Sequence, residues 1–146
     1  MVSTEEAAYF AGLFDGEGSV GIRCNTQGRQ YYSYILRIAI TNTHQGIIEQ
    51  LQNKFAGSIY FLKRYSPAHR QAWYWDLYSR SAFDFLKIIY PYSIIKKPQI
   101  ELAMKFQEQC IHKSVGYNKN KTLEQTMLSE FYKHQISQLN HGLSLD

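Results

Sequence analysis

With 146 residues, 45% of them hydrophobic and 15% aromatic, and a formal net charge of +4, the chain is expected to form one folded domain and not a disordered or low-complexity segment. No apolar run reaches membrane-spanning length, no leader-like segment opens the chain, and Cys24 and Cys110 are not spaced like metal ligands or a disulfide framework. We therefore expect an intracellular protein with reduced thiols and no membrane partner.

The first predicted element is a helix over residues 4–18. Ser3 can cap its first turn, and Glu6, three residues later, completes a capping box. Gly16 and Gly18 are expected to end the helix, because glycine readily adopts the left-handed backbone angles at which helices stop.

This helix combines a stripe of small residues with two acids at its C-terminal end. Ala8, Ala11 and Gly12 are small enough to let another helix approach closely. Asp15 and Glu17 lie where the negative end of the helix dipole disfavours a carboxylate. The residues alone leave two interpretations open: an ordinary amphipathic helix with a glycine stop, or a closely packed helix that delivers an acidic residue to a bound cation.

Two β-hairpins are predicted from alternating apolar and polar residues. The first joins strands over residues 19–25 and 30–42 through a turn at 26–29, and the second joins strands over 58–65 and 71–79. The side chains expected to face the core are Val20, Ile22, Cys24, Tyr34, Leu36, Ile38, Ile40, Ile59, Phe61, Trp73, Trp75 and Leu77.

Helices are predicted between and after the hairpins. One opens at residues 43–46 and ends at Gly57. Ser81 is expected to cap the next helix, which ends near Pro91 because proline disrupts a helix interior. Pro98 suits the first position of another helix.

A basic loop at residues 116–121 and a final helix from Thr122 to about Leu139 complete the chain. The order of helix, hairpin, helix, hairpin and further helices predicts an α+β domain with helices grouped on one face of a sheet. The single domain, residues 1–146, then comprises the first helix (4–18), the sheet with its helices (19–110) and a C-terminal helical cap (111–146).

Charge is unevenly distributed along the chain. Residues 1–18 carry four acids and neither Lys nor Arg, whereas residues 19–75 carry seven Lys or Arg and one acid, Glu49. A basic strand region beside an acidic helix end suits a nucleic-acid surface around a metal site. The alternative is a solvated basic face, but many of these residues share one parity on the predicted strands, which argues against it.

Residues 10–18, with the sequence FAGLFDGEG, resemble the signature of the LAGLIDADG homing endonucleases. Gly16 replaces an alanine of the signature, and Glu17 replaces its second aspartate. The order of elements extends the resemblance over roughly residues 1–100. The residues identical to the signature are Ala11, Gly12, Leu13, Asp15 and Gly18.

The resemblance implies a fold, αββαββα, with a four-stranded antiparallel sheet in each subunit. Family members with one copy of the motif are homodimers, whereas those with two copies are pseudo-symmetric monomers. Because this chain carries one copy, the resemblance implies a homodimer in which the two sheets form one DNA-binding saddle.

The resemblance also implies a function. Family members are site-specific homing endonucleases, typically intron-encoded, that hydrolyse phosphodiester bonds and leave a double-strand break in a long pseudo-palindromic DNA site. We therefore expect a Mg²⁺-dependent DNA endonuclease, with Mn²⁺ or Ca²⁺ able to occupy the site, double-stranded DNA as partner and no small-molecule substrate. The alternatives are an RNA-splicing maturase and a non-catalytic DNA-binding regulator on the same fold. An organelle (chloroplast or mitochondrion) or a prokaryotic cytoplasm suits such an enzyme.

The resemblance assigns the metal and the catalytic lysine to particular residues. Glu17 is expected to be the metal ligand, and the carbonyl of the adjacent Gly16 is a second candidate ligand. Lys97 resembles the family's pocket lysine, and Lys96 is the alternative because the register around Pro98 is open by one residue.

The remaining site residues come from the resemblance and from strand parity. Asn42 matches a polar position that orients water in the family, and Gln45 is a further catalytic candidate. The residues expected to contact DNA bases are Arg23, Asn25, Ser33, Arg37, Thr41, Tyr60, Arg64, Tyr74 and Asp76, because they have outward parity and a two-stranded ribbon fits the major groove. Phosphate contacts are expected from Lys54, Lys63, Lys119 and Lys121. The expected dimer interface consists of Ala8, Ala11, Gly12 and Asp15.

Overall fold

The computed structural model describes residues 1–25, 33–64, 66–111 and 123–142. The turn predicted at 26–29, the first three residues of the second predicted strand, Tyr65, the loop at 116–121 and Thr122 lie outside them. In chain order the elements are α1 (Thr4–Glu17), β1 (Gly18–Asn25), β2 (Ser33–Asn42), α2 (Gln45–Phe55), β3 (Ser58–Leu62), β4 (Ala72–Tyr78), α3 (Ser79–Ile89), the 3₁₀ turn η1 (Tyr90–Tyr92), α4 (Lys97–Phe106), the π-helical turn η2 (Gln107–Ile111) and α5 (Leu123–Asn140).

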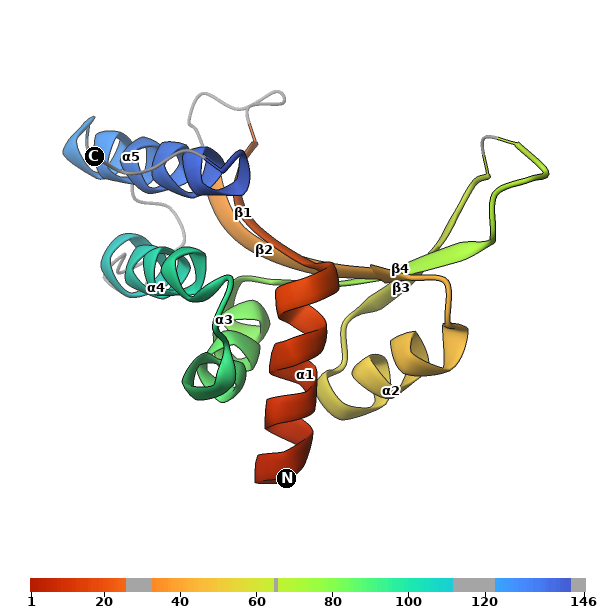
Figure 1. Cartoon of the computed structure of the whole chain (residues 1–146). Helices are drawn as coiled ribbons and strands as arrows, with labels where there is room; N and C mark the ends of the chain where they lie inside the picture. Colours follow the sequence, from red (N-terminus) through yellow and green to blue (C-terminus); the bar gives the residue numbers. More distant parts are fainter. Residues whose placement is uncertain (26–32, 65, 112–122, 143–146) are drawn as a thin grey trace.

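The four strands form one antiparallel sheet in the order β1-β2-β4-β3. Helices α1, α2, α3 and α4 lie on one face of this curved sheet, and none of the four covers its concave face (Figure 1). Helix α5 packs against α4 and β1. The arrangement confirms the predicted α+β fold. None of the helices in the described part of the chain has the length and apolar character needed to cross a membrane.

The core lies between the sheet and its helices, on the predicted face of β2 and β4. Tyr34, Leu36, Ile38 and Ile40 are each at most 3% exposed, and Trp75 is fully buried. Burying such a side chain contributes roughly 1.5–3 kcal/mol, and a one-residue shift would turn the whole set towards solvent. The alternation therefore fixes which side chains reach the concave face.

Phe61 on β3 departs from this pattern, because it was expected in the core and is 67% exposed. β3 is an edge strand, and the outer part of the β3–β4 hairpin extends beyond α2 (Figure 1). The Phe61 ring contacts Trp73 edge-on, with 6.1 Å between ring centroids. The predicted burial of Phe61 is wrong because the helical layer does not extend that far.

Helix α1 begins as predicted but ends differently. The capping box is confirmed: the Glu6 N–H donates to Ser3 Oγ (3.2 Å), and the Ser3 N–H donates to Glu6 Oε2 (2.9 Å). Gly16 remains inside the helix, and Gly18 has extended angles (φ −82°, ψ 157°) and begins β1. A Cβ at Gly18 would lie 2.5 Å from the Phe14 carbonyl oxygen. Gly18 therefore permits close contact with α1 and does not act as a left-handed stop.

Helix α3 begins two residues before Ser81, the predicted cap. Ser79 is its first residue and has a left-handed backbone (φ 49°), and Tyr78 at the N-cap makes no side-chain capping bond. The prediction of a Ser81 cap is wrong because the turn at Ser79 joins β4 to α3 without a loop.

Candidate active site and nucleic-acid interface

Glu17 is the last residue of α1, and its side chain is exposed. Its carboxylate makes no hydrogen bond or ion pair with any other described residue. The β1–β2 ladder begins at the pair Gly18 and Ile40, so the next positions are Glu17 and Thr41, close to the end of β2 at Asn42. A carboxylate with no partner among the described residues thus lies where α1 meets the sheet.

Asp15, two residues earlier, is 8% exposed and anchors the segment before α4. Its Oδ1 accepts from Ser93 Oγ (2.5 Å) and the Lys96 N–H (3.0 Å), and its Oδ2 accepts from the N–H groups of Ile94 (2.7 Å) and Ile95 (3.1 Å). Burial alone would raise the pKa of Asp15, but these hydrogen bonds outweigh it and hold the pKa below its ordinary value. Asp15 therefore ties the end of α1 to the start of α4.

The two candidate pocket lysines lie in different surroundings. Lys96 Nζ donates to the main-chain oxygen of Asp15 (2.5 Å), which puts the ammonium at the C-terminal end of α1, near Glu17 in sequence. Lys97 Nζ instead lies 4.8 Å from the centroid of the Tyr90 ring. Of the two, Lys96 is the one placed beside the acidic end of α1.

Asn42, His44 and Gln45 shape the start of α2. Asn42 Oδ1 accepts from the His44 N–H (2.8 Å), and His44 Nδ1 accepts from the Ile47 N–H (3.2 Å) as the helix cap. Gln45 Nε2 donates to Glu49 Oε1 (2.9 Å) along the helix. The Asn42 amide nitrogen makes no bond to another described residue, so it is the group of this segment that is available to a ligand.

The outward face of α1 carries small residues at a spacing of four. Ala8, Gly12 and Gly16 are exposed, and a Cβ added at either glycine would meet nothing within 4 Å. Ala11 and Asp15, which were expected at the same interface, are instead 0% and 8% exposed. They point into the subunit and cannot line this face. Gly16 joins it because α1 continues past the predicted stop.

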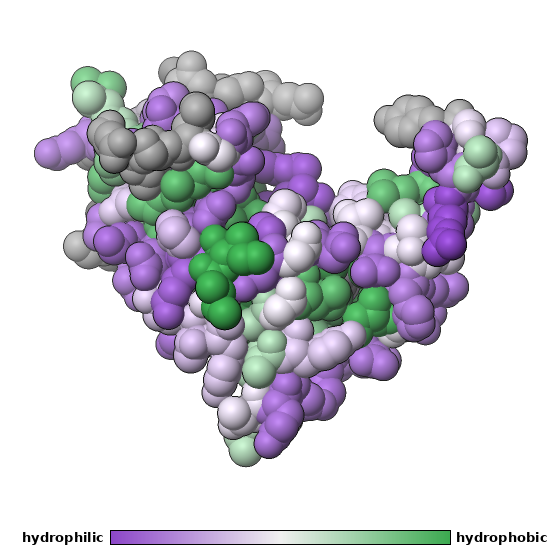
Figure 2. Space-filling view, viewed as in Figure 1, coloured by the Kyte–Doolittle hydropathy of each residue, from purple (hydrophilic) through white to green (hydrophobic). Residues whose placement is uncertain are grey.

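Ile94 and Ile95, whose role was not predicted from the sequence, add an apolar patch. Their exposed fractions are 83% and 69%, and their N–H groups bond to Asp15 of α1. Figure 2 shows apolar side chains gathered at the surface on this side of the molecule. The sequence signal for this patch is the pair of isoleucines directly before two lysines, because adjacent exposed apolar residues often mark an interaction site.

The concave face displays the residues predicted to contact DNA bases. In register, Arg23 lies opposite Ile35, Asn25 opposite Ser33, and Arg37 opposite Tyr78. The row Thr41, Tyr74 and Tyr60 crosses three strands, and the Tyr60 and Tyr74 rings stack with 4.8 Å between centroids. Asp76 shares this parity but is 1% exposed, so it is not available for a base contact.

Basic side chains collect at the outer end of the β3–β4 hairpin, around a concavity of about 670 Å³. Lys54 does not belong to this group, because it pairs with Glu6 (2.7 Å) on the helical side. Lys119 and Lys121 lie outside the described residues. The concavity is lined by Leu62, Lys63, Arg64, His69, Arg70 and Ala72.

No family model matches this sequence, and a comparison with curated proteins gives no match. Solved structures do match. I-CvuI in complex with the I-CreI target aligns with a TM-score of 0.74 at 16% identity, covering 92% of this chain and 82% of that chain. The archaeal intron-encoded I-Vdi141I, complexed with DNA, gives 0.61 at 14%, covering 88% and 96%. The LAGLIDADG homing endonuclease I-GzeII, in complex with its DNA target, gives 0.57 at 17%, covering 99% and 46%.

The chain has the LAGLIDADG homing endonuclease fold. It spans nearly the full length of I-Vdi141I and less than half of I-GzeII, so it corresponds to one LAGLIDADG unit. In this fold residues 10–18 occupy the second half of α1 and the start of β1, as the resemblance implied.

A single LAGLIDADG unit offers few oxygen donors for a metal. The described residues contain no group of three or more His, Cys, Asp and Glu placed to hold a metal ion. The donors at the end of α1 are the Glu17 carboxylate and the Gly16 carbonyl. Mg²⁺ prefers oxygen ligands, keeps several waters and needs only one or two carboxylates. These two donors would fit a divalent ion that prefers oxygen ligands, provided that further oxygen donors complete the site.

Proposed function

We propose that the protein is a site-specific homing endonuclease that hydrolyses one phosphodiester bond in each strand of a long pseudo-palindromic DNA duplex. The observation that carries the proposal is the exposed Glu17 carboxylate, without a partner among the described residues, at the edge of a concave face with Arg and Tyr side chains. A carboxylate near phosphates repels them, so it favours a metal-dependent enzyme over a regulator that only binds DNA. No separate observation favours an RNA-splicing maturase.

The proposed active form is a homodimer built on the outward face of α1. Small residues at Ala8, Gly12 and Gly16 let two backbones approach closely, and packing inside the subunit does not require glycine at either position. Ile94 and Ile95 extend the face with apolar surface of the kind that marks interfaces. A two-fold rotation about this face would place the two acidic helix ends together and join the two concave faces.

In this dimer each phosphodiester bond faces a set of groups suited to hydrolysis. The two Glu17 carboxylates, with the Gly16 carbonyls, would hold Mg²⁺ close to the scissile phosphates. When bound, Mg²⁺ neutralises phosphate charge and makes a coordinated water a stronger nucleophile. I-CvuI bound to DNA has been solved with 2 mM Mg and with 2 mM Ca, which supports a divalent ion here.

The chain's own side chains supply the remaining steps. Lys96, held at the end of α1 by the Asp15 carbonyl, adds positive charge where negative charge develops on the phosphate. The amide nitrogen of Asn42, which makes no bond to another described residue, would donate to a water or a phosphate oxygen. Gln45, the first residue of α2, is the weaker candidate because its amide already bonds to Glu49.

The duplex would lie along the concave face. Polar side chains of β1, β2 and β4 would read base edges in the major groove, where each base pair has a distinct pattern of donors and acceptors. The basic end of the β3–β4 hairpin would contact phosphates, which adds affinity without sequence information. The predicted base-contacting residues other than Asp76 are exposed or half-buried, as this role requires.

Selection of cleaved duplexes from a random library tests the proposed function. With Mg²⁺ we expect enrichment of one long, nearly palindromic site cut in both strands, and without divalent ions we expect no cutting. The selected site should be nearly palindromic because a two-fold symmetric dimer contacts two related half-sites. Absence of any cleaved duplex with Mg²⁺ or Mn²⁺, from protein that is folded, would refute the proposal.

The variant Gly12→Leu is expected to convert the dimer to a monomer while leaving the subunit folded. The side chain would enter the space that the partner helix needs, whereas a Cβ at position 12 meets no described residue of the same subunit within 4 Å. Because Leu has a higher helix propensity than Gly, by somewhat less than about 0.8–1 kcal/mol, the substitution should not destabilise the helix of the monomer. Sedimentation velocity measures the oligomer, and circular dichroism measures the fold.

The control for Gly12→Leu is Lys105→Leu, which adds the same side chain to an exposed position on α4. It should leave the dimer intact. A Gly12→Leu protein that still sediments as an active dimer would place the interface elsewhere than on α1.

A further inference from the structure

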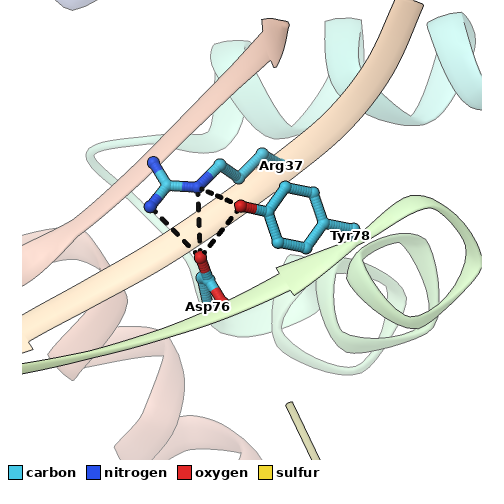
Figure 3. Close-up of polar contacts among 3 residues, drawn as sticks. All are labelled: Arg37, Asp76 and Tyr78. Atoms are coloured by element: carbon cyan, nitrogen blue, oxygen red, sulfur yellow. Dashed lines mark hydrogen bonds and ion pairs between the residues drawn. The ribbon is translucent and has the colours of Figure 1, made fainter. Parts of the chain in front are cut away.

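Arg37, Asp76 and Tyr78 form a hydrogen-bonded cluster on the concave face (Figure 3). Asp76 Oδ2 accepts from Arg37 Nε (3.3 Å), Arg37 NH2 (3.2 Å) and the Tyr78 hydroxyl (3.1 Å). The Tyr78 hydroxyl in turn accepts from Arg37 Nε (3.2 Å). The Asp76 side chain is 0% exposed and the Arg37 side chain 20%, so the carboxylate lies under the guanidinium.

Strand register explains why a carboxylate is buried on an otherwise open face. Asp76 lies opposite Ala39 on β2 and Ser58 on β3, whose side chains are too short to cover it. Arg37 and Tyr78 face each other one row away, and both side chains lean over Asp76. Asp76 is thus enclosed by its neighbours and cannot reach a base. Its expected role as a base-contacting residue is not supported by this arrangement.

The guanidinium of Arg37 is hydrogen-bonded to the described residues through only one of its edges. The edge with Nε and NH2 is bonded to a single oxygen of Asp76, whereas NH1 makes no hydrogen bond to any other described residue. The guanidinium carbon lies 5.6 Å from the Tyr74 ring centroid and 5.9 Å from that of Tyr78. Two rings and a carboxylate therefore restrain the plane of the group, and Tyr60 stacks on Tyr74 in turn.

We propose that Asp76 is a positioning residue that holds the NH1–NH2 edge of Arg37 towards the DNA major groove, where it reads a guanine. Guanine is the base that offers two acceptors, N7 and O6, to a two-pronged donor. A guanidinium fixed in advance loses less side-chain entropy on binding, so it discriminates better than a mobile arginine. The proposal rests on the proposed function, and it assigns a preference for guanine to one base pair in each half-site.

Base preference in bound duplexes tests this arrangement without relying on cleavage. Duplexes are selected from a random library by wild type, Arg37→Lys, Asp76→Asn and the double variant, with Ca²⁺ in place of Mg²⁺. Wild type is expected to prefer guanine at one position of each half-site by roughly 5- to 150-fold, the range of a bidentate contact. Arg37→Lys keeps a cation beside Asp76 but lacks the two parallel N–H donors of a guanidinium. The guanine preference should therefore be lost at that position and at no other.

Asp76→Asn should weaken the same preference at the same position, although the substituted side chain would touch no DNA. The double variant should show the profile of Arg37→Lys alone, because Asp76 acts only through Arg37. Affinity for random duplex should stay within about twofold in every variant, since no phosphate contact is removed. Arg23→Lys is the matched control: it changes another arginine of the concave face and should leave the guanine position unaltered.

Each failure has a distinct meaning. If wild type enriches no sequence, the proposed function fails and this inference with it. If wild type enriches a site but Arg37→Lys changes no position, Arg37 is not a base reader. If Arg37→Lys removes a guanine preference that Asp76→Asn leaves intact, Asp76 does not position it. Melting temperatures recorded for all variants separate these results from unfolding, and the conservative Arg37→Lys keeps the first comparison valid if Asp76→Asn is unstable.

Discussion

Glu17→Gln is expected to bind its duplex as tightly as wild type, or slightly more tightly, while cleaving it on the order of 10³-fold more slowly. The amide keeps the size of the side chain and removes the only acidic group at this helix end that has no partner among the described residues. Without that charge the proposed site would lose its main metal ligand, whereas repulsion between protein and phosphates would decrease. Binding is measured with Ca²⁺ and cleavage with Mg²⁺ on the same duplex.

Two companion variants make the Glu17 result specific. Glu17→Asp keeps a carboxylate, restores the residue type of the LAGLIDADG signature, and should retain measurable cleavage. Glu124→Gln removes an exposed carboxylate from α5, which packs on α4 and β1, and should cleave at the wild-type rate. Wild-type cleavage by Glu17→Gln would refute the assignment of Glu17 as the metal ligand, although the protein would still be an endonuclease.

The layered fold could be predicted because its signals are local. The strands alternate with period two, the capping box at Ser3 and Glu6 marks the start of α1, and Pro98 marks the start of α4. The errors also have local causes. Phe61 has the parity of a core residue, but exposure depends on how far the helical layer extends, which no strand pattern contains.

The site was harder to predict where its residues come from distant segments. Asp15 and Lys96 are 81 residues apart, and only the packing of α1 against the start of α4 brings the Lys96 ammonium to the end of α1 in place of Lys97. The burial of Asp76 likewise depends on Arg37 of β2 and Tyr78 of β4, which face each other one row away and cover the carboxylate. Parity therefore predicts which face a side chain lies on, and cross-strand neighbours decide whether it can touch a ligand.

Asp15→Asn is expected to lower the free energy of unfolding by about 2–4 kcal/mol at pH 7. The carboxylate accepts from three backbone N–H groups and the Ser93 hydroxyl, whereas an amide would place its own donor against one pair of these donors. The control Asp84→Asn breaks an exposed pair with Arg80 and should cost at most about 0.5 kcal/mol. Urea denaturation of the three proteins measures the difference, and equal losses would show that Asp15 is no anchor.

The pH dependence of the same measurement follows from the lowered pKa of Asp15. Because its pKa is lower in the folded protein than the ordinary value of 3.8, its contribution is complete above that value and disappears as pH falls through the folded pKa. The stability difference between wild type and Asp15→Asn should therefore be constant from about pH 5 to pH 7 and shrink below about pH 4. A difference that stayed constant as the pH fell below about 4 would mean that the shape of the side chain, and not the charge of the carboxylate, holds α1 to the segment that carries Lys96.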